Sequence, residues 1–229
     1  MKLADIIETF ISGDWGEETV AEDTPNSVFC IRGADIVPIT NHCFNGIPQR
    51  FVCDKTIENK TLKAGDLIIE KSGGSPTQST GRIVYVSEDL IKAKGNVVCS
   101  NFCTAFRVKA GWNPLYVYYF WQNVYNHGAF FNFEGKTSGI KNLQLDNALS
   151  AIDIEYLPLE KQNQIVTSLT SIDEKIKVNR QINDNLRASR AQSQTQFELC
   201  RGAAVNADVS PNLLTLDRSS RGAKVRLAA

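Results

Sequence analysis

The sequence has few of the features that mark specialised classes of protein. Its 229 residues include only six cysteines, and no two of them form a tight Cys-x-x-Cys pair. This spacing excludes a small disulfide-rich protein, and we expect a cytoplasmic protein with reduced thiols. The amino-terminal stretch lacks a basic segment followed by an apolar one, so no secretory signal is predicted.

The chain also lacks an excess of charge of either sign. Lysine and arginine number 25, as do aspartate and glutamate. The balance is uneven along the chain, because residues 1–35 hold eight acidic and two basic residues, whereas residues 201–229 hold five basic and two acidic ones. Composition alone therefore does not indicate a nucleic-acid-binding protein. If DNA is bound, a local patch or a partner must neutralise the phosphates.

Residues 110–133 contain no charged side chain, which is typical of a membrane span or of a buried helix. This segment does contain several polar residues and a proline, namely Asn113, Pro114, Gln122, Asn123, Asn126, His127 and Asn132. Each polar side chain would need a partner inside lipid. The sequence therefore predicts a buried aromatic helix over residues 114–127 and no contact with a membrane.

Complete sets of catalytic or metal-binding residues are missing as well. Asn113-Pro114-Leu115-Tyr116 is close to an amino-methyltransferase motif, but no glycine-rich cofactor loop accompanies it, and proline suits the start of a helix. The carboxylates Asp66 and Glu70 do not have the spacing of a metal-dependent nuclease site. The possible zinc ligands do not have the spacing of a zinc site either; they are His42, Cys43, Cys53, Cys99 and Cys103. We therefore expect no catalytic residue, no metal and no cofactor.

The hydrophobic pattern indicates a mixed α+β domain. Leu3, Ile6, Ile7 and Phe10 have helical spacing and predict a helix over residues 2–12. Short β-rich runs separated by turns then predict strands at 28–32, 65–70, 82–86, 96–100 and 105–108. A loop and a short helix are expected over residues 128–150, and a last strand over residues 151–157.

The character of the chain changes at residue 159. From there to residue 200 the sequence contains no glycine and no proline. Positions spaced alternately by four and three residues form a seam whose first part is apolar and whose middle is polar; it includes Ile165, Leu169, Ile172, Ile176, Asn179, Asn183 and Leu186. This spacing predicts one long helix with a coiled-coil surface. Residues 202–229 have no clear period and are expected to be a tail, either flexible or added to the natural sequence.

A helix of this length needs a partner. About 40 helical residues span roughly 60 Å, whereas a domain of about 160 residues is roughly 35 Å across. The sequence offers no second helix of similar length, so we expect the partner helix to come from another chain. The alternative is a break near Asn179–Asn183 that folds the segment back as a short hairpin. In the unbroken helix, the two asparagines would set register between the paired helices.

The segment with the most promising binding chemistry is the glycine loop, residues 71–82. It is polar, contains three glycines and is bracketed by Lys71 and Arg82. Its glycines allow close approach to a ligand, and its side chains can contact phosphates or base edges. It does not have the spacing of a phosphate-binding P-loop. A mobile surface hairpin explains the composition equally well.

Several motifs, taken in order, resemble the specificity subunits of type I restriction–modification systems. The segments that carry this resemblance are Gly13-Asp14-Trp15-Gly16, residues 31–36, residues 65–76, Ser100-Asn101-Phe102, residues 137–143 and residues 154–162. The resemblance covers about residues 1–200. It implies a globular target-recognition domain, residues 1–158, which we call the head, followed by a conserved dimerising helix, residues 159–201.

The resemblance further implies a non-catalytic subunit that reads one half of a bipartite target in double-stranded DNA. The usual subunit carries this unit twice, whereas this sequence carries it once. A homodimer through the helix seam would therefore restore the second half, and methyltransferase and restriction subunits would be the other partners. A non-catalytic coiled-coil scaffold whose head binds another protein is the alternative.

The residues expected to contact DNA are chosen from loop position and side-chain chemistry. They come from the glycine loop, from a second polar segment near residue 140, and from the flanks of the loop over residues 40–49. They are Lys71, Ser72, Gln78, Arg82, Thr137, Ser138, Lys141, Asn41 and Arg50. A structural role is the alternative for each, because serine and threonine in turns often bond to their own backbone.

Overall fold

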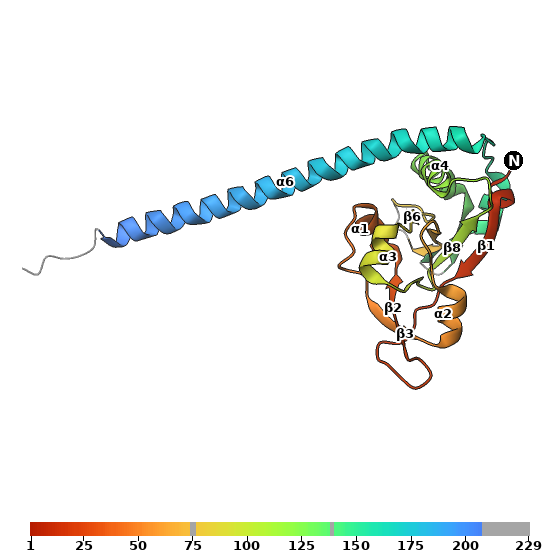
Figure 1. The fold of residues 1–229 in the computed structure, drawn as a ribbon, viewed down its shortest axis with the longest axis horizontal. Coiled ribbons are helices and arrows are strands. Elements are labelled where there is room, and N and C mark those ends of the chain that lie inside the picture. Colours follow the sequence, from red (N-terminus) through yellow and green to blue (C-terminus); the bar gives the residue numbers. More distant parts are fainter. Residues whose placement is uncertain (74–76, 138–139, 208–229) are drawn as a thin grey trace, which may run out of the picture. The chain divides into compact units, whose positions relative to one another are not determined.

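The computed structural model of the chain describes residues 1–73, 77–137 and 140–207, without the side chains of residues 136–137 and 196–207. The chain divides into two compact units, Met1–Glu174 and Lys175–Ala229. Within the described residues, the first unit contains three sheets and several short helices (Figure 1), and one long helix, α6, ends the described chain. The predicted mixed α+β fold with a long C-terminal helix is confirmed.

The central sheet of the first unit has four antiparallel strands. Their spatial order is β1 (Ile7–Ser12), β8 (Cys103–Val108), β4 (Leu67–Glu70) and β6 (Ile83–Tyr85). Successive side chains of β4 enter opposite cores, since Leu67 and Ile69 belong to one hydrophobic cluster and Ile68 to the other. Both faces of this sheet are therefore covered, which explains the unbroken apolar run in β4.

The aromatic helix α4 (Pro114–Asn126) covers one face of the central sheet. Asn113 caps it by accepting hydrogen bonds from the backbone N–H groups of Leu115 and Tyr116, and Pro114 occupies the first turn. Trp121 is fully buried and stacks on Phe130 of η3 (Ala129–Phe133) with ring centroids 4.7 Å apart. The predicted helix over residues 114–127 is confirmed. Among the described helices, none combines the length and apolarity that crossing a bilayer requires.

A second sheet packs on the face of the central sheet that α4 does not cover. It consists of β3 (Gln49–Val52), β2 (Asn26–Ile31) and β7 (Val97–Cys99), with β2 and β7 parallel. Three short helices and a 3₁₀ turn surround it: η2 (Gly33–Asp35), α1 (Ile36–Thr40), α2 (Asp54–Lys60) and α3 (Glu88–Lys94). All five strands predicted between residues 27 and 110 are present, with boundaries shifted by up to two residues.

A third, smaller sheet joins parts of the chain that the sequence analysis treated separately. It consists of β5 (Ser72–Gly73), β10 (Ile140–Leu143) and β9 (Glu134–Thr137). The short helix α5 (Leu145–Ala151) follows β10. Strands β9 and β10 lie within residues 128–150, where only a loop and a short helix were expected, and their polar composition explains why no strand was predicted there.

Two predicted elements are wrong. Residues 2–12 form a 3₁₀ turn, η1 (Leu3–Ile6), and strand β1 instead of a helix. The apolar spacing misled the prediction because Phe10, which completed the helical stripe, is 46% exposed, and β1 is stabilised by pairing with β8. The strand predicted over residues 151–157 is reduced to an isolated bridge between Lys2 and Asp153.

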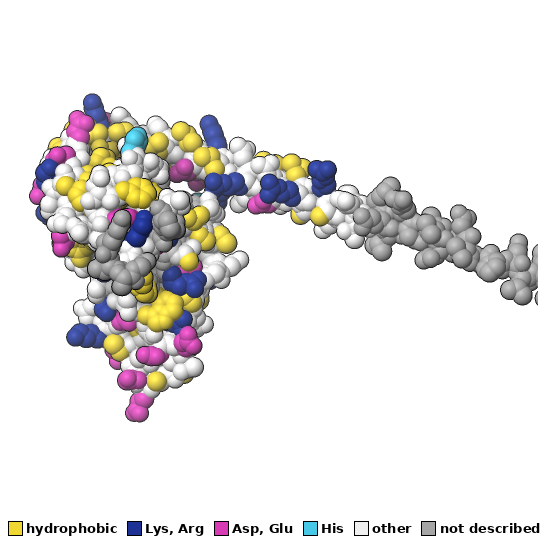
Figure 2. All heavy atoms as spheres, turned by 180° about the vertical axis from the view of Figure 1, so that it is seen from behind, with side chains coloured by type: hydrophobic (Ala, Val, Ile, Leu, Met, Phe, Trp, Pro, Cys, Tyr) yellow, Lys and Arg dark blue, Asp and Glu magenta, His cyan; other side chains and the backbone are white. Residues whose placement is uncertain are grey.

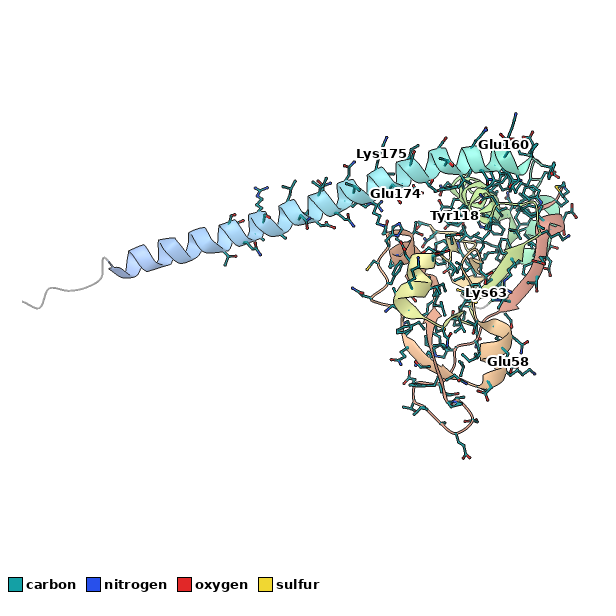
Figure 3. All side chains as sticks on the ribbon, in the orientation of Figure 1. Glu58, Lys63, Tyr118, Glu160, Glu174 and Lys175 are labelled. Atoms are coloured by element: carbon teal, nitrogen blue, oxygen red, sulfur yellow. The ribbon has the colours of Figure 1, made fainter. Side chains whose placement is uncertain are left out.

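Helix α6 runs without interruption from Leu159 to Ala207, over 49 residues. The alternative of a break at Asn179–Asn183 is therefore contradicted. The helix ends six residues beyond the boundary predicted at residue 201, and residues 208–229 of the expected tail lie outside the described residues. In the first unit, Tyr118 of α4 lies among closely spaced side chains, whereas side chains project around α6 from Lys175 onward (Figure 3).

Candidate nucleic-acid interface

The structure brings the glycine loop and the second polar segment together. Strand β5, at the start of the loop, pairs with β10, so that Gly73 lies opposite Lys141 and Ser72 lies opposite Asn142. The Ser72 hydroxyl also donates to the Asn142 side-chain oxygen. We call β5, β10 and β9 the loop sheet. Two of the three groups of predicted DNA contacts therefore share one surface.

The base of the glycine loop is closed by a buried ion pair. Arg82 donates from Nε and Nη2 to the two carboxylate oxygens of Glu70, at 2.8 and 2.6 Å. The Glu70 side chain is 4% exposed, and its hydrogen bonds raise the pKa of Arg82. A Cβ atom at Gly33 or Gly73 would lie 2.4 or 2.7 Å from Glu70 Oε1. Arg82 thus has a structural role, which leaves its predicted contact with DNA without geometric support.

Aromatic side chains of α4 hold the far end of the loop. The indole N–H of Trp121 donates to the Gly81 carbonyl at 2.7 Å, and the Tyr125 hydroxyl donates to the Ser79 carbonyl at 3.0 Å. Gly81 has φ of +96°, and a Cβ atom there would lie 3.1 Å from the Phe130 ring. The backbone over residues 79–81 is therefore fixed by the core of the head.

The groups left exposed around the loop sheet are suited to contacts with a nucleic acid. Gln78 is exposed, and Lys71 and Ser72 are half-buried. Lys71 also lines a groove of about 450 Å³ together with Phe10, Thr104, Leu143, Gln144, Leu145, Asp146 and Asn147. An amide that can read a base edge thus lies in the same loop as an ammonium group that can contact a phosphate.

Two predicted residues lie away from the loop sheet. Arg50 is on β3, where it forms an ion pair with Glu18 at 2.9 Å and its guanidinium lies 4.1 Å from the centre of the Trp15 ring. Asn41 is the C-terminal cap of α1. Ser138 lies outside the described residues, as does the side chain of Thr137. Arg50 and Asn41 therefore add nothing to the surface formed by the glycine loop.

The surface near Arg50 is unfavourable for DNA because it is acidic. Glu17, Glu18, Glu22 and Asp23 are exposed in the loop between β1 and β2. This loop lies at the end of the first unit opposite α4 (Figure 1), where acidic side chains gather in the space-filling view (Figure 2). On the remainder of that face, basic and acidic side chains are interspersed. Phosphates are therefore expected to approach the loop sheet rather than this acidic end.

Among the described residues, no metal-binding cluster is found, and the thiols of Cys30 and Cys103 are deeply buried. The described part of the chain contains no group of three or more histidine, cysteine, aspartate or glutamate side chains that could hold a metal ion. Burial raises the pKa of Cys30 to about 12 and that of Cys103 to about 11, so both thiols stay protonated near neutral pH.

Gln162, a residue that helps attach α6 to the head, was not predicted from the sequence. Gln162 is fully buried, accepts a hydrogen bond from the Asn113 N–H at 2.8 Å, and donates to the carbonyls of Gly111 and Leu157 at 3.1 and 2.8 Å. Asn113 and Tyr119 of the α4 region also donate to Asn163 and Asp173. The signal was a glutamine placed four residues after Pro158, in the first turn of the long helix.

The predicted seam of α6 is an exposed apolar surface in the described chain. Ile165, Ile172, Ile176 and Leu186 have exposed fractions of 38%, 52%, 41% and 63%, and Leu169 is half-buried. Val178 and Ile182, each 49% exposed, form a second apolar stripe that was not predicted. A helix that exposes this much apolar surface is typical of one that binds another helix.

Comparison with solved structures finds chains of related systems at low sequence identity. A chain studied for complex assembly and conformational transition of the type I R-M system is 17% identical, with 88% of this chain and 42% of that chain covered and a TM-score of 0.49. The S subunit from M. genitalium is 12% identical, with coverage of 77% and 39% and a TM-score of 0.48. The HsdS subunit from Thermoanaerobacter tengcongensis is 16% identical, with coverage of 78% and 38% and a TM-score of 0.44.

This chain spans about two fifths of the length of those solved chains. No curated protein matches the sequence. The family model described as "Type I restriction modification DNA specificity domain" matches residues 53–188, a range that includes the glycine loop, the loop sheet and the apolar part of the α6 seam. Since this match covers more than half of the 229 residues, the chain belongs to the family of type I restriction–modification DNA specificity domains.

Proposed function

We propose that this protein is a non-catalytic subunit that reads one half of a bipartite target in double-stranded DNA through its loop sheet. The observation that carries the proposal is the family match over residues 53–188, which contains both polar segments that the fold brings together. Gln78 is the candidate for contact with a base edge, and Lys71 is the candidate for contact with a phosphate.

The second part of the proposal concerns the other half of the target. A second copy of the chain covers the seam of α6, so that a symmetric dimer presents two identical loop sheets. Ile165, Ile172 and Ile176 supply the apolar contacts, and Asn179 and Asn183 set the register of the two helices. The dimer then reads two inverted half-sites at a spacing fixed by the helix length.

Methyltransferase and restriction subunits complete the proposed assembly, which acts in the cytoplasm. The zero net charge of the chain supports this part, because one subunit without an excess of cations can neutralise few phosphates. The interspersed charges on the head in Figure 2 agree with that argument. The methyltransferase subunit would therefore supply most of the attraction to the DNA backbone.

The test is selection from duplexes of random sequence, performed at low salt with and without the methyltransferase subunit of the same system. Enrichment of an inverted, gapped motif is the expected result. Low salt matters because weak phosphate contacts are lost as ionic strength rises. If no sequence is enriched under either condition, the head does not read DNA and the scaffold interpretation takes its place.

A further inference from the structure

The ammonium group of Lys141 is directed into the protein. Its Nζ atom lies 3.0 Å from Glu134 Oε2, donates to the Gln78 carbonyl at 3.3 Å, and lies 5.2 Å from the centre of the Phe131 ring. The side chain is only 19% exposed. Since an ammonium has three donors, these contacts engage the group on three sides. A phosphate could reach it only by displacing part of this set.

Glu134 links the same cluster to the next residues of the glycine loop. Its Oε1 atom accepts a hydrogen bond from the Thr80 N–H at 2.7 Å and one from the Thr80 hydroxyl at 3.3 Å. The Glu134 side chain is 5% exposed. One carboxylate on β9 and one ammonium on β10 therefore hold the loop backbone at residues 78 and 80, on either side of the buried Ser79.

We propose that Glu134 and Lys141 are positioning residues that fix the backbone around Gln78, and that Lys141 does not neutralise a phosphate. The exposed Gln78 amide discriminates between bases only if its backbone stays in place when DNA binds. The ion pair supplies that rigidity from a neighbouring strand. This inference rests on the proposed function, because it specifies how the same loop sheet reads its target.

The first experiment measures how affinity for the selected duplex depends on salt. A lysine that contacts a phosphate contributes about 0.9 to the slope of log K against log salt concentration. The double variant Glu134→Gln with Lys141→Gln leaves the net charge unchanged and leaves no unpaired buried charge. We expect its slope to equal that of the unmodified protein. Lys71→Gln is the comparison, since loss of a phosphate contact there lowers the slope by about 0.9.

The second experiment measures base discrimination, which a purely structural role would leave unchanged. The base pair read by Gln78 is identified as the position at which Gln78→Ala loses discrimination. Lys141→Met is expected to reduce discrimination about tenfold at that base pair alone, as for loss of one good base contact. Combined with Gln78→Ala it should have no additional effect, because both changes remove the same contact.

Lys141→Met leaves Glu134 buried without its charged partner, which can prevent folding. In that case base discrimination is measured on the double glutamine variant. Glutamine at position 141 is shorter than lysine and loses the hydrogen bond to the Gln78 carbonyl. Two results would overturn this inference alone, provided that a motif is selected. One is a salt slope reduced by about 0.9 in the double variant, and the other is unchanged discrimination at the base pair read by Gln78. The absence of any selected motif overturns the proposed function, and this inference with it.

Discussion

At the scale of single residues, two buried carboxylates lie at the two ends of strand β4, and each is held by an arginine. Asp66 accepts from Arg107 at 2.8 and 3.0 Å, and Glu70 accepts from Arg82 at 2.8 and 2.6 Å. Bidentate pairs of this kind fix geometry as well as contributing energy. They also remove two arginines from the cations available to a nucleic acid, which strengthens the need for a partner that binds the phosphates.

The Glu70–Arg82 pair depends on a glycine in a different part of the chain. A Cβ atom at Gly33 would lie 2.4 Å from Glu70 Oε1, and the carboxylate is enclosed and cannot move away. We expect Gly33→Ala to lower the free energy of unfolding by about 1–3 kcal/mol through overpacking. Gly46→Ala is the control, because nothing lies within 4 Å of that Cβ position. Equal urea midpoints for the two variants would contradict the enclosed position of Glu70.

Gln78 is the residue whose exposure and position best suit contact with a base edge. Gln78→Ala is expected to weaken binding to the selected duplex by about 1–3 kcal/mol, the range for a good amide contact with a base. The measurement is a titration of labelled duplex by fluorescence anisotropy at fixed salt. Asn59→Ala on α2 removes an exposed amide outside the loop sheet and should leave the affinity unchanged. Unchanged affinity for Gln78→Ala would remove this residue from the interface.

At the scale of elements, local patterns identified five of the ten described strands and the helices α4 and α6. Runs such as Leu67–Glu70 are apolar, short and bounded by turn residues, so their structure is encoded within a few residues. Strand β1 failed because its apolar residues fit both a helical and an extended pattern. The alternative was decided by pairing with β8, about 95 residues away along the chain, which no local pattern contains.

The candidate site was predictable only as separate pieces. The composition of the glycine loop and of the segment near residue 140 marked both as polar, but their adjacency is created by pairing between β5 and β10. The roles of Arg82 and Lys141 could not be predicted, because their acidic partners, Glu70 and Glu134, had no recognisable spacing relative to them. A basic residue in a polar loop has the same sequence signature whether it binds a phosphate or a buried carboxylate.

One buried amide, that of Gln162, makes three hydrogen bonds where α6 joins the head. Replacing Gln162 by alanine leaves the Asn113 N–H and the carbonyls of Gly111 and Leu157 without their partners. We expect the free energy of unfolding to fall by about 2–4 kcal/mol, from lost hydrogen bonds and buried unsatisfied groups. Urea denaturation followed by tryptophan fluorescence measures this, since Trp112 adjoins the contact.

Gln164→Ala provides the matched control for Gln162→Ala. Gln164 lies half a turn further along the same helix and its side chain is exposed, so its loss should change stability by less than about 0.5 kcal/mol. Similar losses for both variants would show that helix propensity, and not the buried amide, determines the result.

At the scale of the whole molecule, the two apolar stripes of α6 have different consequences for assembly. With 100° of rotation per residue, Ile165, Ile172 and Ile176 fall within about 40° of one another, whereas Val178 lies at least about 120°, and Ile182 at least about 80°, around the helix from them. A single partner helix covers only one such stripe. In the proposed dimer, the partner helix therefore covers Ile165, Ile172 and Ile176, whereas Val178 and Ile182 remain exposed.

Ile172→Asp combined with Ile176→Asp places two carboxylates in the seam, where pairing with a second copy would bury them without partners. We expect light scattering to show a monomer with an intact head for this variant and a dimer for the unmodified chain. Val178→Asp combined with Ile182→Asp adds the same charge to the same helix outside the seam and should leave the dimer intact. A dimer that survives the first pair of changes, or dissociates equally with both pairs, would place the contact between copies elsewhere on the chain.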